Sequence, residues 1–319
     1  MKIFVNEKKI SIAKGAKVAD LVKKHKPGAD VCILNGFPCL MEHTVEAGDR
    51  LVLIRKGETP SKKELEHLLT ARHTPGIHAR LKKASVGIAG CGGLGSTAAM
   101  ALARVGIGKL VIVDFDVVEP SNLNRQQYFV SQIGTPKVAA LAENIKKANP
   151  YVAVVTHRVR IVPENVKPLF LGVNVIIEAF DRADQKQMLV ESVLRRMPKK
   201  PLIVGNGMAG YGANELFKTR RIGHLYVCGD ETSEAGHGFG LMAPRVGVCA
   251  HMQANLALEI ILGPDPRITN DPSIRRGGTS TSSVYQLGTC ELRMTKRNKM
   301  KVDSKYFVAP DTKIMNDEC

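Results

Sequence analysis

The chain has few aromatic residues and no long apolar run, and each shortage argues against a class of protein. Aromatic residues make up 5% of the 319 residues, and no nucleic-acid-binding motif accompanies them, which disfavours nucleic acid as the main partner. The most apolar stretch, residues 245–262, contains His251, Gln253 and Glu259. It therefore falls short of the roughly 18 apolar residues that a membrane-spanning helix needs. Polar Glu7 comes too early for a secretory signal peptide.

Paired cysteines are also missing. The seven cysteines are an odd number without a Cys-x-x-Cys pair, so the sequence encodes neither a disulfide framework nor a four-cysteine zinc site. We therefore expect a cytoplasmic protein. Its 46 basic and 30 acidic residues give a net charge of +16, which favours acidic partners such as nucleotides or an acidic protein.

Residues 1–57 show the pattern of a small α+β sheet domain. Ile3 and Val5 alternate as in a half-buried strand, and apolar spacing over 18–22 indicates a short helix. Asn35-Gly36 is the strongest short hairpin signal. The length of the whole chain suggests about two domains.

This first segment resembles the ubiquitin-like ThiS sulfur carriers, a likeness that implies a β-grasp fold. The resemblance rests on Met-Lys-Ile-x-Val-Asn at 1–6 and Ala-Gly-Asp-x-Leu-Val-Leu-Ile at 47–54. Carriers of that family end in a free Gly-Gly whose carboxylate reacts, whereas Gly57 is followed here by Glu58 and a long chain. We interpret residues 1–57 as a carrier-like module that is not itself a substrate. The alternative is a generic small sheet domain.

A glycine loop between two apolar strands marks the second half. A strand over 86–89 leads into Gly-Cys-Gly-Gly-Leu-Gly at 90–95, then an Ala-rich helix and a strand that ends at Asp114. This order is the Rossmann context, in which glycines and a helix N-terminus hold phosphates. Asp114 lies 19 residues after Gly95, where an acid accepts hydrogen bonds from ribose hydroxyls. The absence of Gly-x-x-x-x-Gly-Lys-Ser/Thr excludes a P-loop.

Two cations follow the ribose acid. Arg125 and Lys137 have no function in hydride transfer, but they suit a reaction in which phosphate charge builds up. Asp181 follows an apolar strand at 175–177, where parallel strands place ligands, and one carboxylate plus phosphate oxygens suits Mg²⁺. A dinucleotide-dependent oxidoreductase and a non-catalytic ATP-binding scaffold remain as alternatives.

The same segments resemble the ThiF/MoeB/ubiquitin-activating family. The match comprises the glycine loop with its following Ser, Asp-Phe-Asp-x-Val at 114–118, Ser-Asn-Leu-x-Arg-Gln at 121–126 and Pro-Lys at 136–137, and it continues to about residue 262. These enzymes adenylate the C-terminal glycine of a ubiquitin-like protein. The motifs most resemble those of the ThiF subgroup of thiamine biosynthesis, including members with a ThiS-like N-terminal extension.

The resemblance implies ATP and Mg²⁺ as cofactors, with Arg125, Lys137 and Asp181 as catalytic residues and Asp181 as the Mg²⁺ ligand. It also implies a separate sulfur carrier ending in Gly-Gly, a sulfur donor protein and a homodimer. The nucleotide-binding set would be Gly90, Gly92, Gly93, Gly95, Asp114, Asp116, Asn122, Arg125, Gln126, Lys137, Asp181 and Arg182. Asp116 could equally cap a loop.

The sequence departs from the family pattern in its cysteines. Many relatives hold zinc with two Cys-x-x-Cys pairs, which this chain lacks, so we expect no zinc. No cysteine lies in the 231–240 stretch where some relatives transfer sulfur covalently, and Cys228 is the nearest candidate thiol.

The expected architecture is therefore a Rossmann-like α/β adenylation domain preceded by a ubiquitin-like β-grasp domain. The expected boundaries are 1–57 for the ThiS-like domain, 58–83 for a helical linker, 84–262 for the ThiF-like domain and 263–319 for a mobile basic tail that lies outside the family match.

Overall fold

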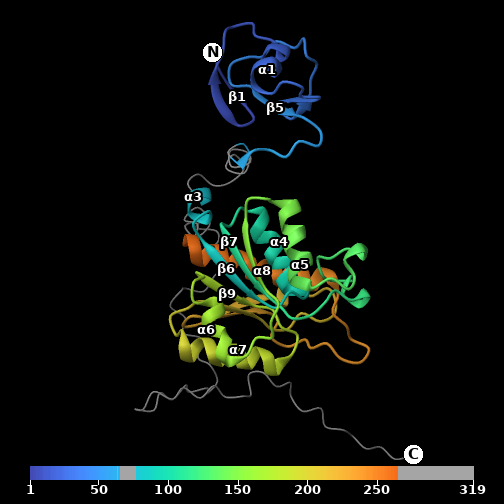
Figure 1. Cartoon of the computed structure of the whole chain (residues 1–319), viewed down its shortest axis with the longest axis vertical. Helices are drawn as coiled ribbons and strands as arrows, with labels where there is room; N and C mark the ends of the chain where they lie inside the picture. Colours follow the sequence, from blue (N-terminus) through green and yellow to red (C-terminus); the bar gives the residue numbers. More distant parts are fainter. Residues whose placement is uncertain (63, 65–76, 265–319) are drawn as a thin grey trace, which may run out of the picture. The chain divides into compact units, whose positions relative to one another are not determined.

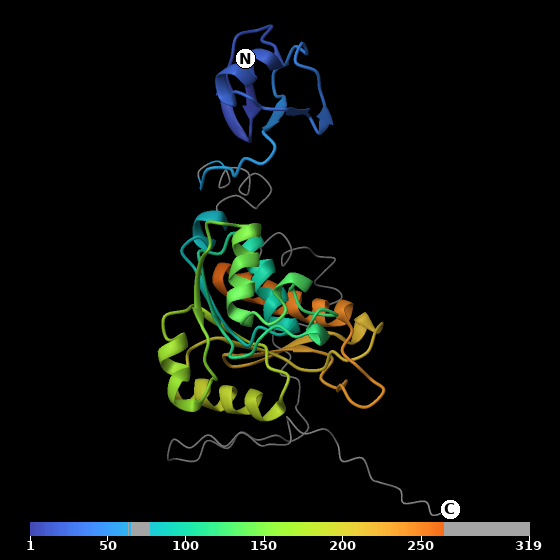
Figure 2. The ribbon, with the colours of Figure 1, turned by 45° about the vertical axis from the view of Figure 1, so that its right-hand side comes forward.

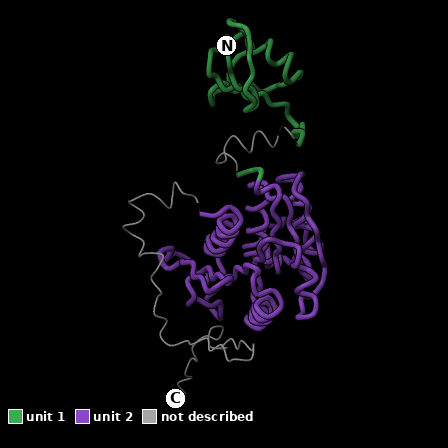
Figure 3. Tube along the Cα trace, turned by 90° about the vertical axis from the view of Figure 1, so that its left-hand side faces the viewer, with its two compact units in different colours: residues 1–79 green, residues 80–319 purple. Residues whose placement is uncertain are grey.

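The computed structural model describes residues 1–62, 64 and 77–264. The chain divides into two compact units, residues 1–79 and 80–319 (Figure 3). Most of the expected linker helix and residues 265–319 of the expected tail lie outside the described residues. Among the described helices, none is long and apolar enough to span a membrane.

In the described part of the first unit, helix α1 packs on a five-stranded sheet. Its strand order, β2-β1-β5-β3-β4, places β1 parallel to β5 in the middle of the sheet. Helix α1 directs Val18, Leu21 and Val22 into a core made with the inward side chains of the strands. The elements are β1 (Lys2–Val5), β2 (Lys8–Ser11), α1 (Val18–His25), β3 (Val31–Leu34), β4 (Phe37–Pro38) and β5 (Arg50–Ile54).

The chain after Gly57 is held against this first unit. Lys26 lies at the C-terminal end of α1, and its ammonium is 3.4 Å from Glu58 and 3.0 Å from Glu64. The side-chain amide of Asn6 also donates to Glu64 at 3.1 Å. Glu58 and Glu64 follow Gly57, so contacts with the first unit continue beyond this glycine.

The second unit contains a seven-stranded sheet in the order β11-β12-β10-β9-β6-β7-β8. All neighbouring pairs are parallel except the edge strand β11 against β12. The strands are β6 (Ser85–Ala89), β7 (Lys109–Val113), β8 (Ala153–His157), β9 (Val175–Glu178), β10 (Leu202–Gly205), β11 (Lys218–Ile222) and β12 (Leu225–Gly229). Strands β6, β9 and β10 are almost fully buried, as expected for a parallel sheet covered on both faces.

Helices cover the two faces of this sheet (Figures 1 and 2). Helices α4, α5 and α8 lie on one face, and α6 and α7 lie on the other, where Phe170 and Leu189 belong to a hydrophobic core cluster. The helices are α3 (Ile77–Leu81), α4 (Gly93–Arg104), α5 (Lys137–Ala148), α6 (Pro163–Phe170), α7 (Ala183–Arg196) and α8 (Ala243–Leu262). Three short 3-10 turns, η1 (Pro120–Asn122), η2 (Val130–Gln132) and η3 (Asn214–Leu216), complete the described elements.

The strand order reverses at β6. From β6 the chain moves outward through β7 and β8, and then crosses to β9 on the other side of β6. The connections leaving β6 and β9 therefore diverge, and a crevice opens at the carboxyl ends of these strands. This arrangement confirms the expected fold class and places the expected nucleotide loop, which follows β6, at the crevice.

Candidate active site

A cavity of about 790 Å³ lies at the carboxyl ends of the parallel strands. Its volume is within the range of small-molecule sites. The loops after β6, β7, β9, β10 and β12 all contribute to its wall. Ten of the twelve expected nucleotide-binding residues line it: Gly90, Gly92, Gly93, Asp114, Asp116, Arg125, Gln126, Lys137, Asp181 and Arg182.

The positions of the loop after β6 require or tolerate glycine for different physical reasons. A Cβ on Gly95 would lie 1.9 Å from the carbonyl oxygen of Gly90, so Gly95 permits helix α4 to pack closely on its own strand. Gly90 has a φ of +96°, which favours glycine. A Cβ on Gly92 would meet nothing nearer than 3.9 Å. The protein itself leaves room at Gly92, which is what close approach of a phosphate to the backbone requires.

Helix α4 begins beside this open position. Gly92 is its N-cap and provides no side-chain cap, so the first backbone N–H groups of α4 are available to an anion. Gly92 and Gly93 both line the cavity. The structure thus presents a positive helix end to the space where the sequence predicts phosphates.

Asp114, at the end of β7, is fixed by two backbone donors. The N–H of Cys91 donates to one carboxylate oxygen at 2.6 Å, and the N–H of Asp116 donates to the other at 2.8 Å. Each oxygen keeps further lone pairs for hydroxyl donors. The Arg160 guanidinium stacks 4.2 Å over the ring of Phe115, and both side chains line the cavity next to Asp114.

The two expected cations are both at the cavity wall. Lys137 begins helix α5 and is nearly buried, and its ammonium lies 3.1 Å from Asp116. The Arg125 guanidinium donates to the carbonyl oxygen of Ser121 at 3.3 Å and to the side chain of Asn124 at 2.9 Å. These bonds hold both positive groups on the side of the cavity where α4 begins.

Gln126 and Asn122 differ in position. Gln126 is buried in the cavity wall, and its Oε1 has no hydrogen-bond partner among the described residues. Such an orphaned acceptor is costly unless a ligand or water satisfies it. Asn122 instead accepts from the N–H of Glu119 at 3.1 Å and stabilises the turn η1, and it is not part of the cavity wall.

Asp181 and Arg182 follow β9 on the opposite side of the crevice. Both are exposed and line the cavity, and Arg182 forms an ion pair with Asp184 at 2.9 Å. Within the described part of the chain, no group of three or more His, Cys, Asp or Glu could hold a metal ion. Asp181 still offers an exposed carboxylate to the cavity, and a carboxylate oxygen is a ligand of the type that Mg²⁺ binds.

A buried ion pair lies behind Asp181. Glu178, the last residue of β9, is fully buried, and the ammonium of Lys186 on α7 lies 3.0 Å from its carboxylate. Burial raises the pKa of Glu178 above its usual value, although Lys186 opposes this effect. Sequence analysis assigned no function to either residue, because a lysine in the first half of an amphipathic helix resembles a solvated surface group.

A second buried pair anchors the far end of the cavity. Arg245, in the first turn of α8, contacts Asp230 at the end of β12 and stacks 4.5 Å over the ring of Phe217. Burial alone would raise the pKa of Asp230, but hydrogen bonds from Ser233, Thr232 and Arg245 outweigh it and hold the pKa well below its usual value. The hydroxyl of Ser233 also accepts from the N–H of Ala209. The pair thus connects two loops that line the cavity, 206–209 and 231–235.

Cys228 is poorly placed for nucleophilic chemistry. It is fully buried in β12, lies outside the cavity wall, and forms a 3.7 Å contact with the hydroxyl of Thr219. Burial raises the pKa of the Cys228 thiol to about 11. The reactive thiolate is therefore scarce at neutral pH.

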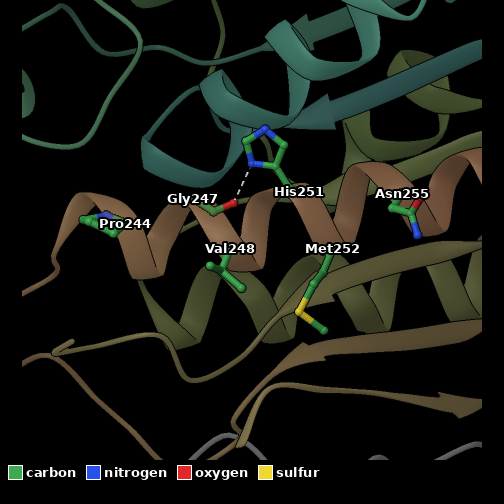
Figure 4. A pocket seen from close by; sticks show the side chains of 6 residues that line it. All are labelled: Pro244, Gly247, Val248, His251, Met252 and Asn255. Atoms are coloured by element: carbon green, nitrogen blue, oxygen red, sulfur yellow. Dashed lines mark hydrogen bonds between the residues drawn. The ribbon is translucent and has the colours of Figure 1, made fainter. Parts of the chain in front are cut away.

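A second pocket, of about 610 Å³, lies along the exposed face of α8 (Figure 4). Figure 4 shows Pro244, Val248 and Met252 on this face, and the ring of His251 hydrogen-bonds the carbonyl oxygen of Gly247. Among the described residues, no Lys, Arg, Asp or Glu side chain lines this pocket. The larger cavity is therefore the candidate active site.

Comparison with known families agrees with this geometry. The ThiF family matches residues 67–300, and the ThiS-like ubiquitin family matches residues 1–57. The chain belongs to the ThiF family. The match continues to residue 300, so the expectation that the likeness ends near residue 262 was wrong.

Curated relatives match a little more than half of the chain. Adenylyltransferase and sulfurtransferase UBA4 of Saccharomyces cerevisiae is 32% identical over 191 residues, which are 58% of this chain and 43% of that protein. Adenylyltransferase and sulfurtransferase MOCS3 of Anopheles gambiae is 30% identical over 191 residues, 57% of this chain and 42% of that protein. The matches span less than half of each relative's length.

Solved structures share the fold. Escherichia coli tRNA N6-threonylcarbamoyladenosine dehydratase, TcdA, in complex with AMP has a TM-score of 0.55 and 23% identity, and the match covers 61% of this chain and 92% of that one. Its complex with ATP gives the same TM-score at 22% identity and the same coverage of both chains. At this identity the likeness concerns the fold alone.

Proposed function

We propose that this chain is an ATP-dependent adenylyltransferase that activates the C-terminal glycine carboxylate of a separate ubiquitin-like sulfur carrier and releases pyrophosphate. One observation carries the proposal: two cations, Arg125 and Lys137, and the uncapped start of α4 lie in the wall of one cavity with Asp114. An oxidoreductase would give these cations no function. The matched relatives named as adenylyltransferases support the same reaction.

The proposed reaction joins two anions. One oxygen of the carrier carboxylate bonds to the α-phosphorus of ATP, the bond from that phosphorus to the β-bridging oxygen breaks, and pyrophosphate leaves with the bridging oxygen. The carboxylate needs no general base. Arg125 and Lys137 offset the repulsion between the reactants, and alignment in the cavity supplies the remainder of the catalysis.

Nucleotide binding is assigned to the rest of the wall. Asp114 holds the ribose, Gly92 and the backbone N–H groups at the start of α4 bind the phosphates, and Gln126 completes this part of the wall. Mg²⁺, when bound, neutralises phosphate charge, and Asp181 is its protein ligand. In this proposal Arg125 and Lys137 lie on one side of the triphosphate, and Asp181, the Mg²⁺ ligand, lies on the other.

The proposed carrier is of the ThiS type, which would place the enzyme in thiamine thiazole synthesis. The ThiS-like residues 1–57 support this choice, and the molybdopterin pathway or another sulfur pathway is the competing assignment. By family resemblance we also propose a homodimer and a sulfur donor protein that acts after adenylation. Residues 1–57 are not the substrate, because Gly57 continues into Glu58 by a peptide bond.

The test is exchange of labelled pyrophosphate into ATP by the full chain, with candidate carriers added one at a time. We expect exchange only with a carrier whose terminal Gly-Gly is intact, and none with the same carrier lacking its last glycine. Exchange that needs no carrier, or none with any Gly-Gly-ending carrier, would contradict the proposal. A carrier of molybdopterin synthesis that works better than a ThiS-type carrier would move the enzyme to the other pathway.

A further inference from the structure

The buried pair of Glu178 and Lys186 connects three elements at the bottom of the candidate active site. Lys186 projects from the first half of α7, and its ammonium lies 3.0 Å from each carboxylate oxygen of Glu178 and 3.0 Å from the carbonyl oxygen of Gly205. Glu178 ends β9 and Gly205 ends β10. One ammonium group therefore joins the ends of two parallel strands to a helix.

The pair also fixes the backbone that leads to Asp181. The N–H of Phe180 donates to Oε1 of Glu178 at 2.6 Å. The carbonyl oxygen of Glu178 accepts from the side chain of Gln253 on α8 at 2.9 Å. The residue immediately before Asp181 is therefore held by a side chain that cannot move into water, because Glu178 is fully buried.

Lys186 lines the cavity but has no donor to spare. An ammonium has three N–H donors, and the two Glu178 oxygens and Gly205 account for all of them. Contact with a phosphate would require breaking one of these buried bonds. Its place in the wall therefore indicates a supporting role, in contrast to Arg125 and Lys137, which are at the phosphate side.

We propose that the Glu178–Lys186 pair is a positioning pair that holds the β9–α7 turn so that Asp181 is presented to the Mg²⁺ of bound Mg–ATP. The inference rests on the proposed function for the identity of the ligand. It assigns to the pair an effect on metal-dependent nucleotide binding that is separate from its contribution to folding.

The test compares nucleotide binding with and without metal in the full chain. Isothermal titration calorimetry with ATP in EDTA, and then with ATP and excess Mg²⁺, gives two dissociation constants for each variant. For Lys186→Met we expect a weakening of about tenfold or more with Mg²⁺, and less than about threefold in EDTA. Lys186→Arg, which keeps the charge, should restore most of the loss.

Two further variants keep the test decisive if Lys186→Met folds poorly. Glu178→Gln/Lys186→Met removes both buried charges and should regain thermal stability while keeping the Mg²⁺-dependent defect. Asp181→Asn should show the same defect, and adding it to that double variant should cause little further loss, because both act on one interaction.

The proposal is overturned if Glu178→Gln/Lys186→Met binds Mg–ATP as tightly as the parent chain. It is also overturned if the loss of Mg–ATP affinity in the triple variant equals the product of the losses in the double variant and in Asp181→Asn. A pair with a purely structural role would lower the melting temperature and weaken both dissociation constants alike. The proposed function fails in a different way, by absence of carrier-dependent pyrophosphate exchange in the parent chain, whatever the binding data show.

Discussion

The ammonium of Lys137 lies 3.1 Å from the carboxylate of Asp116 in the wall of the candidate active site. Lys137 is nearly buried, whereas the Asp116 side chain is 46% exposed. The acid therefore holds the lysine in place but leaves the pair open to an incoming anion. The first residue of α5 therefore carries a positive charge whose ion-pair partner is partly exposed to solvent.

Replacing Lys137 by Met should lower carrier-dependent pyrophosphate exchange by about 10²-fold, the usual effect of removing one group that stabilises developing charge. The matched control is Lys147→Met in the same helix, where the lysine is exposed and pairs with Glu143. The control should retain parental exchange. Equal losses in the two variants would show that helix α5, and not the charge at the cavity, is what matters.

Gly92→Ala and Gly95→Ala should fail for different reasons. At Gly95 the new methyl would lie 1.9 Å from the carbonyl oxygen of Gly90, so we expect a large fall in melting temperature. At Gly92 its nearest neighbour would be 3.9 Å away and φ is −75°, so the fold should tolerate it. Calorimetry with ATP should nevertheless show weaker binding for Gly92→Ala. Normal ATP affinity in that variant would contradict the assignment of the phosphate site to this loop.

Asp181→Asn should raise the Mg²⁺ concentration needed for half-maximal exchange by about tenfold or more, because Mg²⁺ prefers a carboxylate ligand. Asp184→Asn is the matched control, since Asp184 is also exposed and lies three residues further on, paired with Arg182. The control should leave the Mg²⁺ dependence unchanged. A titration of Mg²⁺ at fixed ATP distinguishes the two variants. If only Asp184→Asn changed the Mg²⁺ dependence, the assignment of the metal to Asp181 would be wrong.

Cys228 should resist alkylation in the native protein. Its thiol is fully buried with a pKa of about 11, whereas Cys39 is partly exposed. Iodoacetamide at pH 8 followed by mass spectrometry should therefore modify Cys39 and spare Cys228, and unfolding should remove the difference. Rapid native modification of Cys228 would revive a covalent sulfur-transfer step at this position.

The same burial predicts a loss of stability in alkali. The folded pKa of Cys228 is raised from 9.0 to about 11 and that of Cys249 to about 12. A raised folded pKa contributes stability that is fully present below the unfolded pKa of 9.0 and is lost as pH rises through 11 and 12. Melting temperatures measured from pH 8 to 11 should fall more for the parent chain than for Cys228→Ser, corrected for the difference at pH 8.

The sequence was sufficient to predict which motifs meet in the wall of the cavity. Gly90, Asp114, Arg125 and Lys137 lie in contiguous motifs, and the order strand, glycine loop, helix and strand fixes where such motifs meet. Two expected residues lie outside the cavity wall: Gly95 packs against the carbonyl oxygen of Gly90, and the Asn122 side chain closes the turn η1. A motif predicts where the backbone passes better than where each side chain points.

The supporting pairs could not be found in this way. Glu178 and Lys186 are eight residues apart and Asp230 and Arg245 fifteen, and each pair meets only after strands and helices have packed. Strand β11 was likewise missed, because the sequence of this exposed edge, Lys-Thr-Arg-Arg-Ile at 218–222, lacks the alternation of a half-buried strand. What sequence analysis lacked was partner information, which local patterns do not carry.

Gly57 is joined to Glu58 by a peptide bond, and Glu58 forms an ion pair with Lys26. Each chain therefore contains one ThiS-like unit and one ThiF-family unit. The ThiS-like unit is therefore present in the same amount as the second unit and cannot separate from it by dilution. Any effect of the ThiS-like unit on the second unit is intramolecular, so it does not depend on the concentration of the chain.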